Sequence, residues 1–231
     1  MKHDVKRILD QHFLLKYLPQ GDLEALSHLA ASRTYRAGES VFLKGDPGKA
    51  MMAVLSGRVR ICSNSVEGRE VVLNVIGPGE VFGEIAMIDG GERTADAFAM
   101  EETELLVLSR RDFMPVLARN PDVCMKLLEL LCRRLRWTSE QMEDMNFLAL
   151  RSRLAKRLAY LADNHGEATG GGDGKAVRIS QQLLANMIGA SREAVNIQLA
   201  AWKDEGVISS RRGWITILDR VQLDRIVDEA A

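Results

Sequence analysis

The longest regular pattern of apolar positions in the chain lies within residues 127–149. Positions spaced alternately by three and four residues form one seam: Leu128, Leu131, Leu135, Thr138, Met142, Met145 and Ala149. This heptad spacing, without Gly or Pro, predicts a helix of about 25 residues, roughly 38 Å long, that packs against a partner helix. The simplest partner is the same helix of a second copy, related by a two-fold axis. The polar step at Thr138 and Ser139 either fixes the register or meets a polar group at mid-helix.

Upstream of this seam the pattern changes twice. Residues 4–32 carry apolar side chains at helical spacing, with a turn at 19–22, and predict helices. From residue 34 to 108, short runs rich in Val, Ile and Leu alternate with turn residues, which predicts an antiparallel sandwich or barrel. The predicted strands are residues 40–43, 51–55, 58–62, 70–76, 95–99 and 104–108. A polar helical stretch over residues 110–119 then leads to the long helix.

The C-terminal third has the pattern of a helix-turn-helix module with a β wing. Residues 179–205 have the spacing of two helices, with Ser180 and Ser191 as N-caps and a Gly-Ala turn between them. Two predicted strands, residues 207–210 and 214–218, flank a basic turn at residues 211–213. A helical pattern over residues 146–164 and a Gly-rich surface loop over 164–175 connect this module to the long helix.

Composition and charge narrow the class of protein. The 231 residues carry a net charge of −1, but residues 151–217 hold ten Lys and Arg against six Asp and Glu, a net of +4. A basic C-terminal part on an acidic remainder of −5 is consistent with nucleic-acid binding by that part. No apolar run approaches 18 residues and the N-terminus has no signal-peptide pattern, so a cytoplasmic protein without membrane contact is expected. The three cysteines form no cluster and the four histidines are scattered, which argues against a metal site.

A second chemical signal is the segment GEIAMIDGGERTA, residues 83–95. Gly83 opens a short helical turn whose backbone N–H groups can face an anion, and Arg93 can supply a guanidinium to a phosphate oxygen. Glu84 can accept a hydrogen bond from a ribose hydroxyl. The chemistry alone leaves two readings open, either a site for a sugar phosphate or a glycine turn beside a surface Glu–Arg pair.

This segment resembles the phosphate-binding cassette of cyclic-nucleotide-binding β-rolls. With the long helix and the winged module, nearly the whole chain, from about Leu14 to Leu218, resembles the catabolite activator (CRP–FNR) family of bacterial transcription regulators. The resemblance implies an α+β fold with an antiparallel, jelly-roll-like β-roll over residues 1–120. It further implies a dimerisation helix and hinge over 121–148, with the hinge near 146–149, and a winged helix-turn-helix over 149–231.

The resemblance also implies the residues of a nucleotide site. Gly83, Glu84, Ile85 and Ala86 match the cassette turn, with Glu84 on the ribose 2′-hydroxyl. The other implied ligand-binding positions are Arg93 and Thr94 at the cyclic phosphate, Arg134 paired with Glu84, Leu73 and Asn74 on a strand facing the base, and Thr138 and Ser139 meeting the base from the two subunits. The implied ligand is cyclic AMP. Cyclic GMP is a second expected ligand, because Thr94 stands where the best-known cyclic-AMP regulators have Ser.

On the DNA side, Arg192 and Glu193 begin the expected recognition helix, whose N-terminal end enters the major groove. The remaining expected DNA contacts are Ser180, Gln182, Ser191, Asn196, Ile197, Arg211 and Arg212. Ser180, Gln182 and Ser191 suit phosphates, as do Arg211 and Arg212 on the wing. Ile197 replaces a second base-reading Arg of the best-known members, so a different operator is expected. The resemblance also implies a homodimer, a double-stranded operator and contact with RNA polymerase.

Three other functions remain alternatives. A regulator of this scaffold can sense another effector, but iron–sulfur sensing needs an N-terminal Cys cluster, and residues 1–30 contain no Cys. An enzyme is a second alternative, against which stands the lack of a supported nucleophile–base pair, HExxH motif or Walker loop. A third is an adaptor that binds no DNA, which the basic C-terminal module disfavours.

Overall fold

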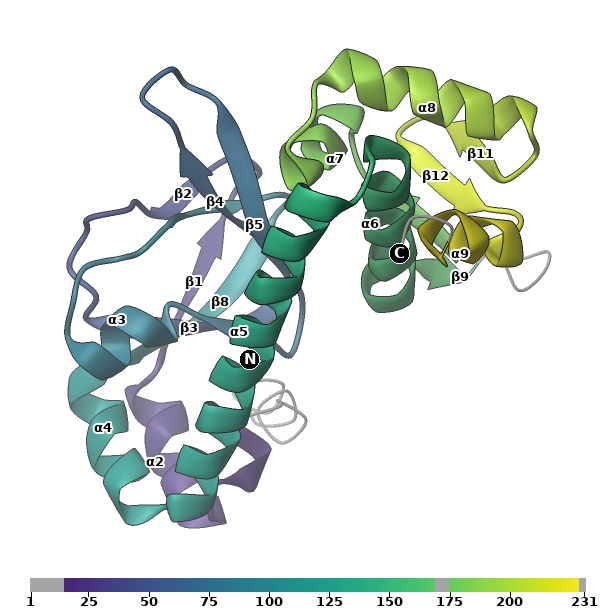
Figure 1. Cartoon of the computed structure of the whole chain (residues 1–231). Helices are drawn as coiled ribbons and strands as arrows, with labels where there is room; N and C mark the ends of the chain where they lie inside the picture. The colour runs from purple at the N-terminus through teal and green to yellow at the C-terminus, as the bar shows by residue number, and fades with distance from the viewer. Residues whose placement is uncertain (1–14, 169–174, 229–231) are drawn as a thin grey trace. The chain divides into compact units, whose positions relative to one another are not determined.

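The computed structural model describes residues 15–168 and 175–228. The first part of the helical stretch predicted for residues 4–32, up to residue 14, lies outside these ranges. The chain divides into two compact units, one formed by Met1–Gly68 and Leu73–Arg136, the other by Arg69–Val72 and Trp137–Ala231. Within the described residues the fold is the predicted α+β combination of a β-roll, a long helix and a C-terminal winged helix-turn-helix (Figure 1).

The roll of the first unit is built from two four-stranded sheets. One sheet has the order β1 (Ala31–Tyr35), β8 (Thr103–Ser109), β3 (Ala50–Ser56) and β6 (Val81–Phe82). The other has the order β2 (Ser40–Phe42), β7 (Asp96–Ala99), β4 (Val59–Asn64) and β5 (Glu70–Ile76). Each of the ladders β1–β8, β3–β8, β3–β6, β2–β7 and β4–β7 is antiparallel.

The sequence of strand β3 is a nearly continuous apolar run, and its packing explains why. Alternate side chains of a strand point to opposite faces. Met51 and Ala53 pack into a core with the helices, whereas Met52 and Val54 pack between the sheets. Both faces of β3 are therefore buried, and the alternation of polar and apolar residues that marks a half-exposed strand is absent here.

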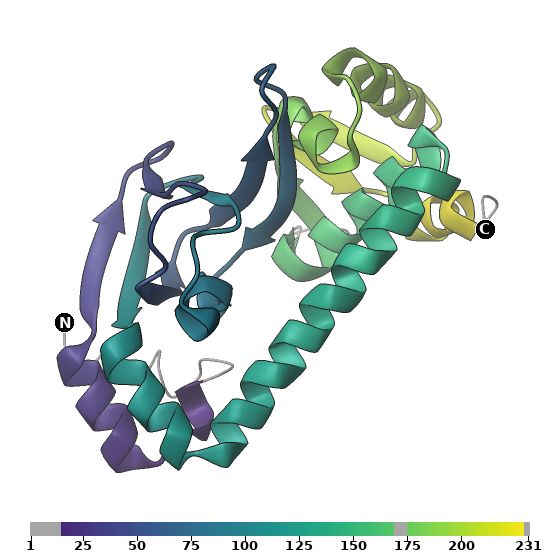
Figure 2. The same cartoon turned by 60° about the vertical axis from the view of Figure 1, so that its left-hand side comes forward.

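One helix precedes the roll in sequence and another follows it, and the two pack against each other. After the 3-10 turn η1 (Leu15–Tyr17), α2 (Gln20–Leu29) lies beside α4 (Arg110–Arg119), as Figure 2 shows. Ser109 caps α4 by accepting a hydrogen bond from the Asp112 backbone N–H at 3.2 Å. The prediction of helix as far as residue 32 was wrong at its end, because β1 begins at Ala31.

The long helix α5 (Pro121–Phe147) begins at a proline, a favourable first helical residue because its missing N–H has no partner to lose. Val123 and Leu127 are buried near its start. Seam residues further along are exposed within this chain, including Leu135 at 69% and Met142 at 63%. The helix ends two residues before the predicted end at Ala149, and α6 (Leu150–His165) starts after a break at Leu148 and Ala149.

The second unit contains the predicted helix-turn-helix and wing. Its elements after α6 are β9 (Glu167–Ala168), β10 (Lys175–Arg178), α7 (Gln181–Ile188), α8 (Arg192–Asp204), β11 (Ile208–Arg211), β12 (Trp214–Ile217) and α9 (Arg220–Asp228). The sheet order is β11-β12-β10-β9. Trp202 on α8 and Leu223 on α9 are fully buried in this unit.

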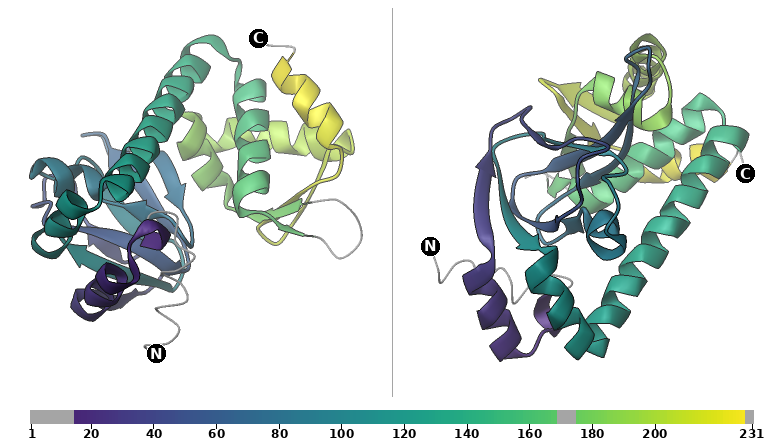
Figure 3. Two further views of the ribbon diagram at one scale, coloured as in Figure 1. Left: turned by 90° about the horizontal axis from the view of Figure 1, so that it is seen from below. Right: turned by 90° about the vertical axis from the view of Figure 1, so that its left-hand side faces the viewer.

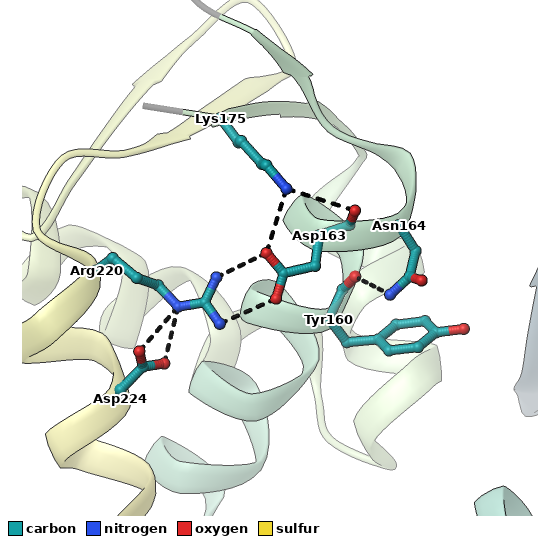
Figure 4. Close-up of polar contacts among 6 residues, drawn as sticks. All are labelled: Tyr160, Asp163, Asn164, Lys175, Arg220 and Asp224. Carbon is teal, nitrogen blue, oxygen red and sulfur yellow. Dashed lines mark hydrogen bonds and ion pairs between the residues drawn. The ribbon is translucent and has the colours of Figure 1, made fainter. Parts of the chain in front are cut away.

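Helix α9, which the sequence pattern did not predict, lies alongside α6 (Figure 3). A charged cluster joins the two helices (Figure 4). Arg220 donates two hydrogen bonds to the Asp163 carboxylate, at 2.8 and 2.9 Å, and its Nε donates to Asp224 at 2.8 Å. Lys175 also faces Asp163, with its Nζ 3.4 Å from a carboxylate oxygen. These hydrogen bonds hold the pKa of Asp163 below its usual range.

Candidate functional site

The predicted cassette is a tight connection between β6 and a short helix. Gly83 follows β6 with φ +77° and is the N-cap of α3 (Glu84–Asp89), which Gly90 closes with the same φ. A residue with a side chain is strained at this φ. A Cβ on Gly83 would also come within 2.6 Å of Arg93 Nη1. The position therefore requires glycine for its backbone conformation and for the approach of Arg93.

Arg93 is buried, with 5% of its surface exposed, and its guanidinium lies against the cassette. Its Nη1 donates to the carbonyl oxygen of Gly83 at 2.8 Å, and its Nη2 donates to that of Ala50 at 2.6 Å. The guanidinium also stacks over the ring of Phe42, 4.2 Å from its centroid. Burial lowers the pKa of Arg93 from its ordinary value, and the nearby carboxylates of Asp46 and Glu84 act in the opposite direction.

Glu84 is the most buried acidic residue of the cassette, with 1% of its surface exposed. Its carboxylate forms an ion pair with the Arg134 guanidinium from α5, as the family resemblance implied. Arg134 also donates to the carbonyl oxygen of Val81, the first residue of β6. Gly83, Glu84 and Arg93 of the cassette are thus brought together with Arg134, which lies 50 residues after Glu84 in the sequence.

The remaining predicted ligand residues are less closely grouped. In the cassette, Ile85 is exposed and Ala86 is buried, and Thr94 is exposed next to Arg93. On β5, Leu73 is exposed and the Asn74 side chain accepts a hydrogen bond from the Val75 backbone N–H at 2.8 Å. Thr138 and Ser139 are exposed on α5, one turn beyond Arg134, and belong to the second unit. Their part in ligand binding stays a prediction.

Sequence reasoning missed Phe42 and the carbonyl oxygens of Ala50 and Val81, which hold the two arginines. Phe42 sits at the end of β2, and its ring centroid lies 5.8 Å from that of Phe82. No motif marks these positions, because backbone carbonyls have no sequence signature and Phe42 has the appearance of an ordinary strand residue. The fold brings Phe42 and the Ala50 carbonyl to Arg93, and the Val81 carbonyl to Arg134.

The second candidate site is the helix-turn-helix. Ser180 caps α7 and Ser191 caps α8, each accepting a backbone N–H hydrogen bond at 3.1 Å. Both hydroxyls keep their own proton as a donor to a phosphate. Arg192, Glu193 and Ile197 are exposed on α8, with Ile197 at 73%. The opposite face of α8 is buried, so the exposed face is available to a groove of DNA.

Two further predicted residues of this module are less available to DNA than Arg192. The Gln182 side chain donates to the Asn186 side-chain oxygen at 2.8 Å. Asn196 is half-buried on α8, and its side-chain oxygen has no hydrogen-bond partner among the described residues. The polar side of Asn196 is therefore a weaker match to a base-reading role than the exposed Arg192.

The wing turns tightly and exposes its basic tip. Arg212 has φ +50° and Gly213 has φ +82°, the two positive angles of a type I′ hairpin turn. Arg211 and Arg212 are both exposed. A groove of about 450 Å³ lies in this unit, lined by residues of the two helices, the segment before them and the wing: Ile179, Ser180, Gln181, Gln182, Arg192, Ser210, Gly213 and Ile215. It brings Ser180, Gln182 and Arg192 onto one concave surface.

Two absences hold for residues 15–168 and 175–228. No group of three or more His, Cys, Asp or Glu side chains is arranged to hold a metal ion. In the same residues, no helix combines the length and apolar character needed to cross a bilayer.

The fold and the two sites define the class as a regulator that joins a cyclic-nucleotide-binding domain to a DNA-binding helix-turn-helix. Residues 32–120 match the family model of the cyclic nucleotide-binding domain, and residues 152–226 match that of the Crp-like helix-turn-helix domain. The chain is 37% identical over 194 residues to the cyclic AMP receptor protein of Thermus thermophilus, covering 84% of this chain and 87% of that protein.

Two more comparisons extend this similarity. The chain is 34% identical over 180 residues to a CRP-like cAMP-activated global transcriptional regulator of Mycobacterium tuberculosis, covering 78% of this chain and 77% of the relative. The solved structure of the regulator CLP of Xanthomonas campestris, described as c-di-GMP responsive, aligns with a TM-score of 0.75 and 27% identity. That alignment covers 87% of this chain and 100% of CLP. The chain belongs to the CRP–FNR family of transcription regulators.

Proposed function

We propose that this protein is a cyclic-AMP-responsive transcription regulator that acts as a homodimer and also binds cyclic GMP. The observation that carries the proposal is the ion pair between buried Glu84 and Arg134, formed beside the guanidinium of Arg93. This arrangement holds one anionic acceptor and one cationic donor at the same glycine turn. A nucleotide with a free 2′-hydroxyl and an anionic cyclic phosphate matches both groups.

In this proposal each cassette residue has a separate task. Arg93 and Thr94 donate to the cyclic phosphate. The Arg93 guanidinium thereby exchanges neutral carbonyl acceptors for an anionic phosphate oxygen, and the new hydrogen bond is charge-assisted. The backbone N–H groups that follow Gly83 face the same phosphate. The Glu84 carboxylate accepts from the ribose 2′-hydroxyl, and Arg134 compensates the charge of Glu84. Ile85 and Ala86 complete the turn.

The base is proposed to lie between β5 and α5. Leu73 and Asn74 face it from the strand, Thr138 meets it from the same subunit and Ser139 from the partner. The exposure of the α5 seam supports a dimer, because Leu128, Leu135 and Met142 are each more than half exposed within the chain. Apolar side chains in a heptad seam gain stability when a second helix covers them.

Nucleotide binding is proposed to shift a population between two arrangements of the dimer. The ligand bridges the cassette and the Thr138 step, selects one register of the paired α5 helices and sets the recognition helices about 34 Å apart, one turn of B-DNA. Arg192 and Glu193 then read base edges, while Ser180, Gln182, Ser191, Arg211 and Arg212 contact phosphates. RNA polymerase is the proposed downstream partner.

The test is calorimetric titration of the nucleotide-stripped full-length protein with cyclic AMP, cyclic GMP and, separately, c-di-GMP. Cyclic AMP is expected to bind and to raise the affinity for an operator selected from a random DNA pool. Cyclic AMP recovered intact after incubation would agree with a binding protein that is not a phosphodiesterase. Binding of c-di-GMP alone, or of none of the three to folded dimer, would overturn the proposed ligand and leave the family unchanged.

A further inference from the structure

A stacked cluster of side chains joins the last part of α5 to α6. The rings of Trp137 on α5 and Tyr160 on α6 have centroids 4.2 Å apart and are tilted by 35°. The Arg157 guanidinium of α6 lies 4.7 Å from the Trp137 ring centroid and 5.9 Å from that of Tyr160. Arg157 is buried, with 4% of its surface exposed, so its charge is stabilised by aromatic faces rather than by water.

Two polar contacts link the same two helices. Arg157 donates to the side-chain oxygen of Gln141. Asp144 lies on α5 about one turn after Gln141, and its carboxylate is 2.8 Å from the Lys156 ammonium of α6. Since Gln141 is neutral, the buried guanidinium depends on the aromatic rings and an amide oxygen, and burial lowers the pKa of Arg157 to about 10. Arg157 therefore stays charged at neutral pH.

The cluster is incompletely packed and incompletely satisfied. It borders a pocket of about 200 Å³, partly open to solvent, whose walls also include Met145, Met187 and Ile188. The Trp137 Nε1 and the Arg153 Nε are buried there without a hydrogen-bond partner among the described residues. Native interiors are normally close-packed, and their buried donors are normally paired. A helix–helix contact without close packing and with unpaired buried donors can rearrange at a lower cost in free energy than a filled core.

The position of the cluster on α5 places it next to the seam. Trp137, Gln141 and Asp144 follow spacings of four and three and share one face of the helix. Thr138, Met142 and Met145, each one residue later, follow the same spacing on the adjoining seam face. A rotation or register shift of α5 that moves the seam must therefore move the three cluster residues by a similar amount.

We propose that Trp137 and Arg157 are positioning residues that couple nucleotide binding to the orientation of the DNA-binding module. This inference rests on the proposed function and names its transmission step. The module follows α5 because the stack, the Gln141 hydrogen bond and the Lys156–Asp144 ion pair hold α6 to one face of that helix. Without the stack, the break at Leu148 and Ala149 leaves the module free to take orientations unrelated to the seam.

The experiment compares Trp137→Ala and Arg157→Lys with the wild-type full-length dimer. Operator affinity is measured with and without cyclic AMP, and the ratio of the two affinities is the coupling. Allosteric couplings are about 5- to 150-fold, and each variant is expected to lower the ratio by about tenfold or to unity. Affinity for cyclic AMP without DNA is expected to stay within about threefold of the wild type, since the cassette is untouched.

Two controls, Arg151→Lys and Trp137→Phe, separate coupling from a merely structural role. Arg151→Lys makes the same substitution on an exposed arginine of α6, which pairs with Glu205 at 3.4 Å, and should keep the ratio. Arg157→Lys keeps the charge but loses the planar face that stacks on rings. Trp137→Phe keeps a ring and should retain most of the coupling that Trp137→Ala loses.

The outcomes distinguish the two proposals. A wild-type dimer that ignores cyclic AMP would refute the proposed function and the coupling with it. A responsive wild type whose ratio is unchanged in folded Trp137→Ala and Arg157→Lys dimers would overturn the coupling alone. Loss of cyclic-AMP affinity in step with operator affinity would also overturn it, because the residues would then support the whole fold.

Discussion

Arg134 on α5 forms an ion pair with Glu84, which is buried at the start of α3. The pair connects the long helix to the glycine turn of the cassette. Because Glu84 has almost no contact with water, its charge depends on Arg134 for compensation. In the proposed mechanism the same carboxylate accepts from the ribose, so one buried group serves both the fold and the ligand.

Removing Arg134 is therefore expected to destabilise the roll as well as to weaken ligand binding. Arg134→Ala should lower the free energy of unfolding by about 3 kcal/mol, the typical cost of leaving a buried charge without its partner. The double variant Glu84→Gln/Arg134→Ala should be more stable than Arg134→Ala, because no uncompensated charge remains. Urea denaturation measures both, with exposed Arg136→Ala as control. Equal stability of single and double variants would contradict the compensation.

The effect of a side chain at Gly83 on ligand binding can be compared with its effect at Gly79, a glycine with a similar backbone conformation. Gly83→Ala and Gly79→Ala both place a side chain at positive φ, +77° and +84°, at a shared cost of about 1–2 kcal/mol. Only the Gly83 substitution meets Arg93, since a Cβ on Gly79 has no atom within 4 Å. Gly83→Ala should weaken cyclic-AMP binding by about tenfold or more through the displaced guanidinium. Gly79→Ala should bind normally, and equal losses would count against Arg93 as the phosphate ligand.

The parts of the fold that follow local rules were predictable from the sequence. Ser180 and Ser191 predict the starts of α7 and α8, because a short hydroxyl side chain before a periodic apolar run can accept from the first free backbone N–H groups of a helix. Val195, Leu199 and Trp202 face inward on α8 as their spacing predicts. The long helix α5 and the Glu84–Arg134 pair were also anticipated, the latter through family resemblance rather than spacing.

The parts that depend on long-range contacts were not predictable. Strand β1 is exposed at four of its five positions and carries little apolar signal, so it forms because β8 offers a ladder. Strand β6 has two residues, too few for any alternation. The partners of Arg93 are backbone carbonyls and Phe42, which strand pairing rather than sequence spacing brings to the cassette.

Thr94 tests which nucleotide the cassette prefers. In the proposed site its hydroxyl can accept from the guanine 2-amino group, a contact that adenine cannot make. Thr94→Ala should therefore weaken cyclic GMP more than cyclic AMP, by up to about tenfold for one lost hydrogen bond. Thr94→Ser keeps the hydroxyl and should keep the wild-type order of affinities. Calorimetry with both nucleotides gives the comparison, and equal losses in Thr94→Ala would remove the basis for cyclic-GMP binding.

The cluster of Figure 4 predicts a pH-dependent contribution to the stability of the second unit. Arg220 holds the pKa of Asp163 below its ordinary 3.8, so the contribution is present above that pH and is lost as the pH falls through the lower folded value. Because these side chains are nearly half exposed, Arg220→Ala should cost no more than about 1 kcal/mol at pH 7. The difference from the wild type should shrink below about pH 4.

Urea denaturation at pH 7 and at pH 3.5, followed by tryptophan fluorescence, measures this difference. Arg225→Ala removes a second arginine from the exposed side of α9 and serves as the control for helix propensity and net charge. A stability difference between Arg220→Ala and the wild type that does not change with pH would show that Asp163 is not the group involved.

Ile197 tests how α8 reads DNA. It is 73% exposed on the expected recognition face, where the best-known family members carry a second base-reading arginine. Ile197→Arg should introduce a preference for G at one position of each half-site, because a bidentate guanidinium contact discriminates by about 1–3 kcal/mol, or roughly 5- to 150-fold. Selection from a random operator pool, done in parallel for wild type and variant, shows the change in sequence.

The added charge of Ile197→Arg must be separated from base recognition. A charge that contacts only phosphates raises affinity for specific and unrelated DNA alike, whereas a base contact raises affinity only for sites with the new G. Ile197→Lys carries the same charge without the planar fork and should select G less sharply. An unchanged selected sequence, with higher affinity for all DNA, would mean that residue 197 lies over the backbone. Arg192 and Glu193 would then be left to read the operator from the first turn of α8.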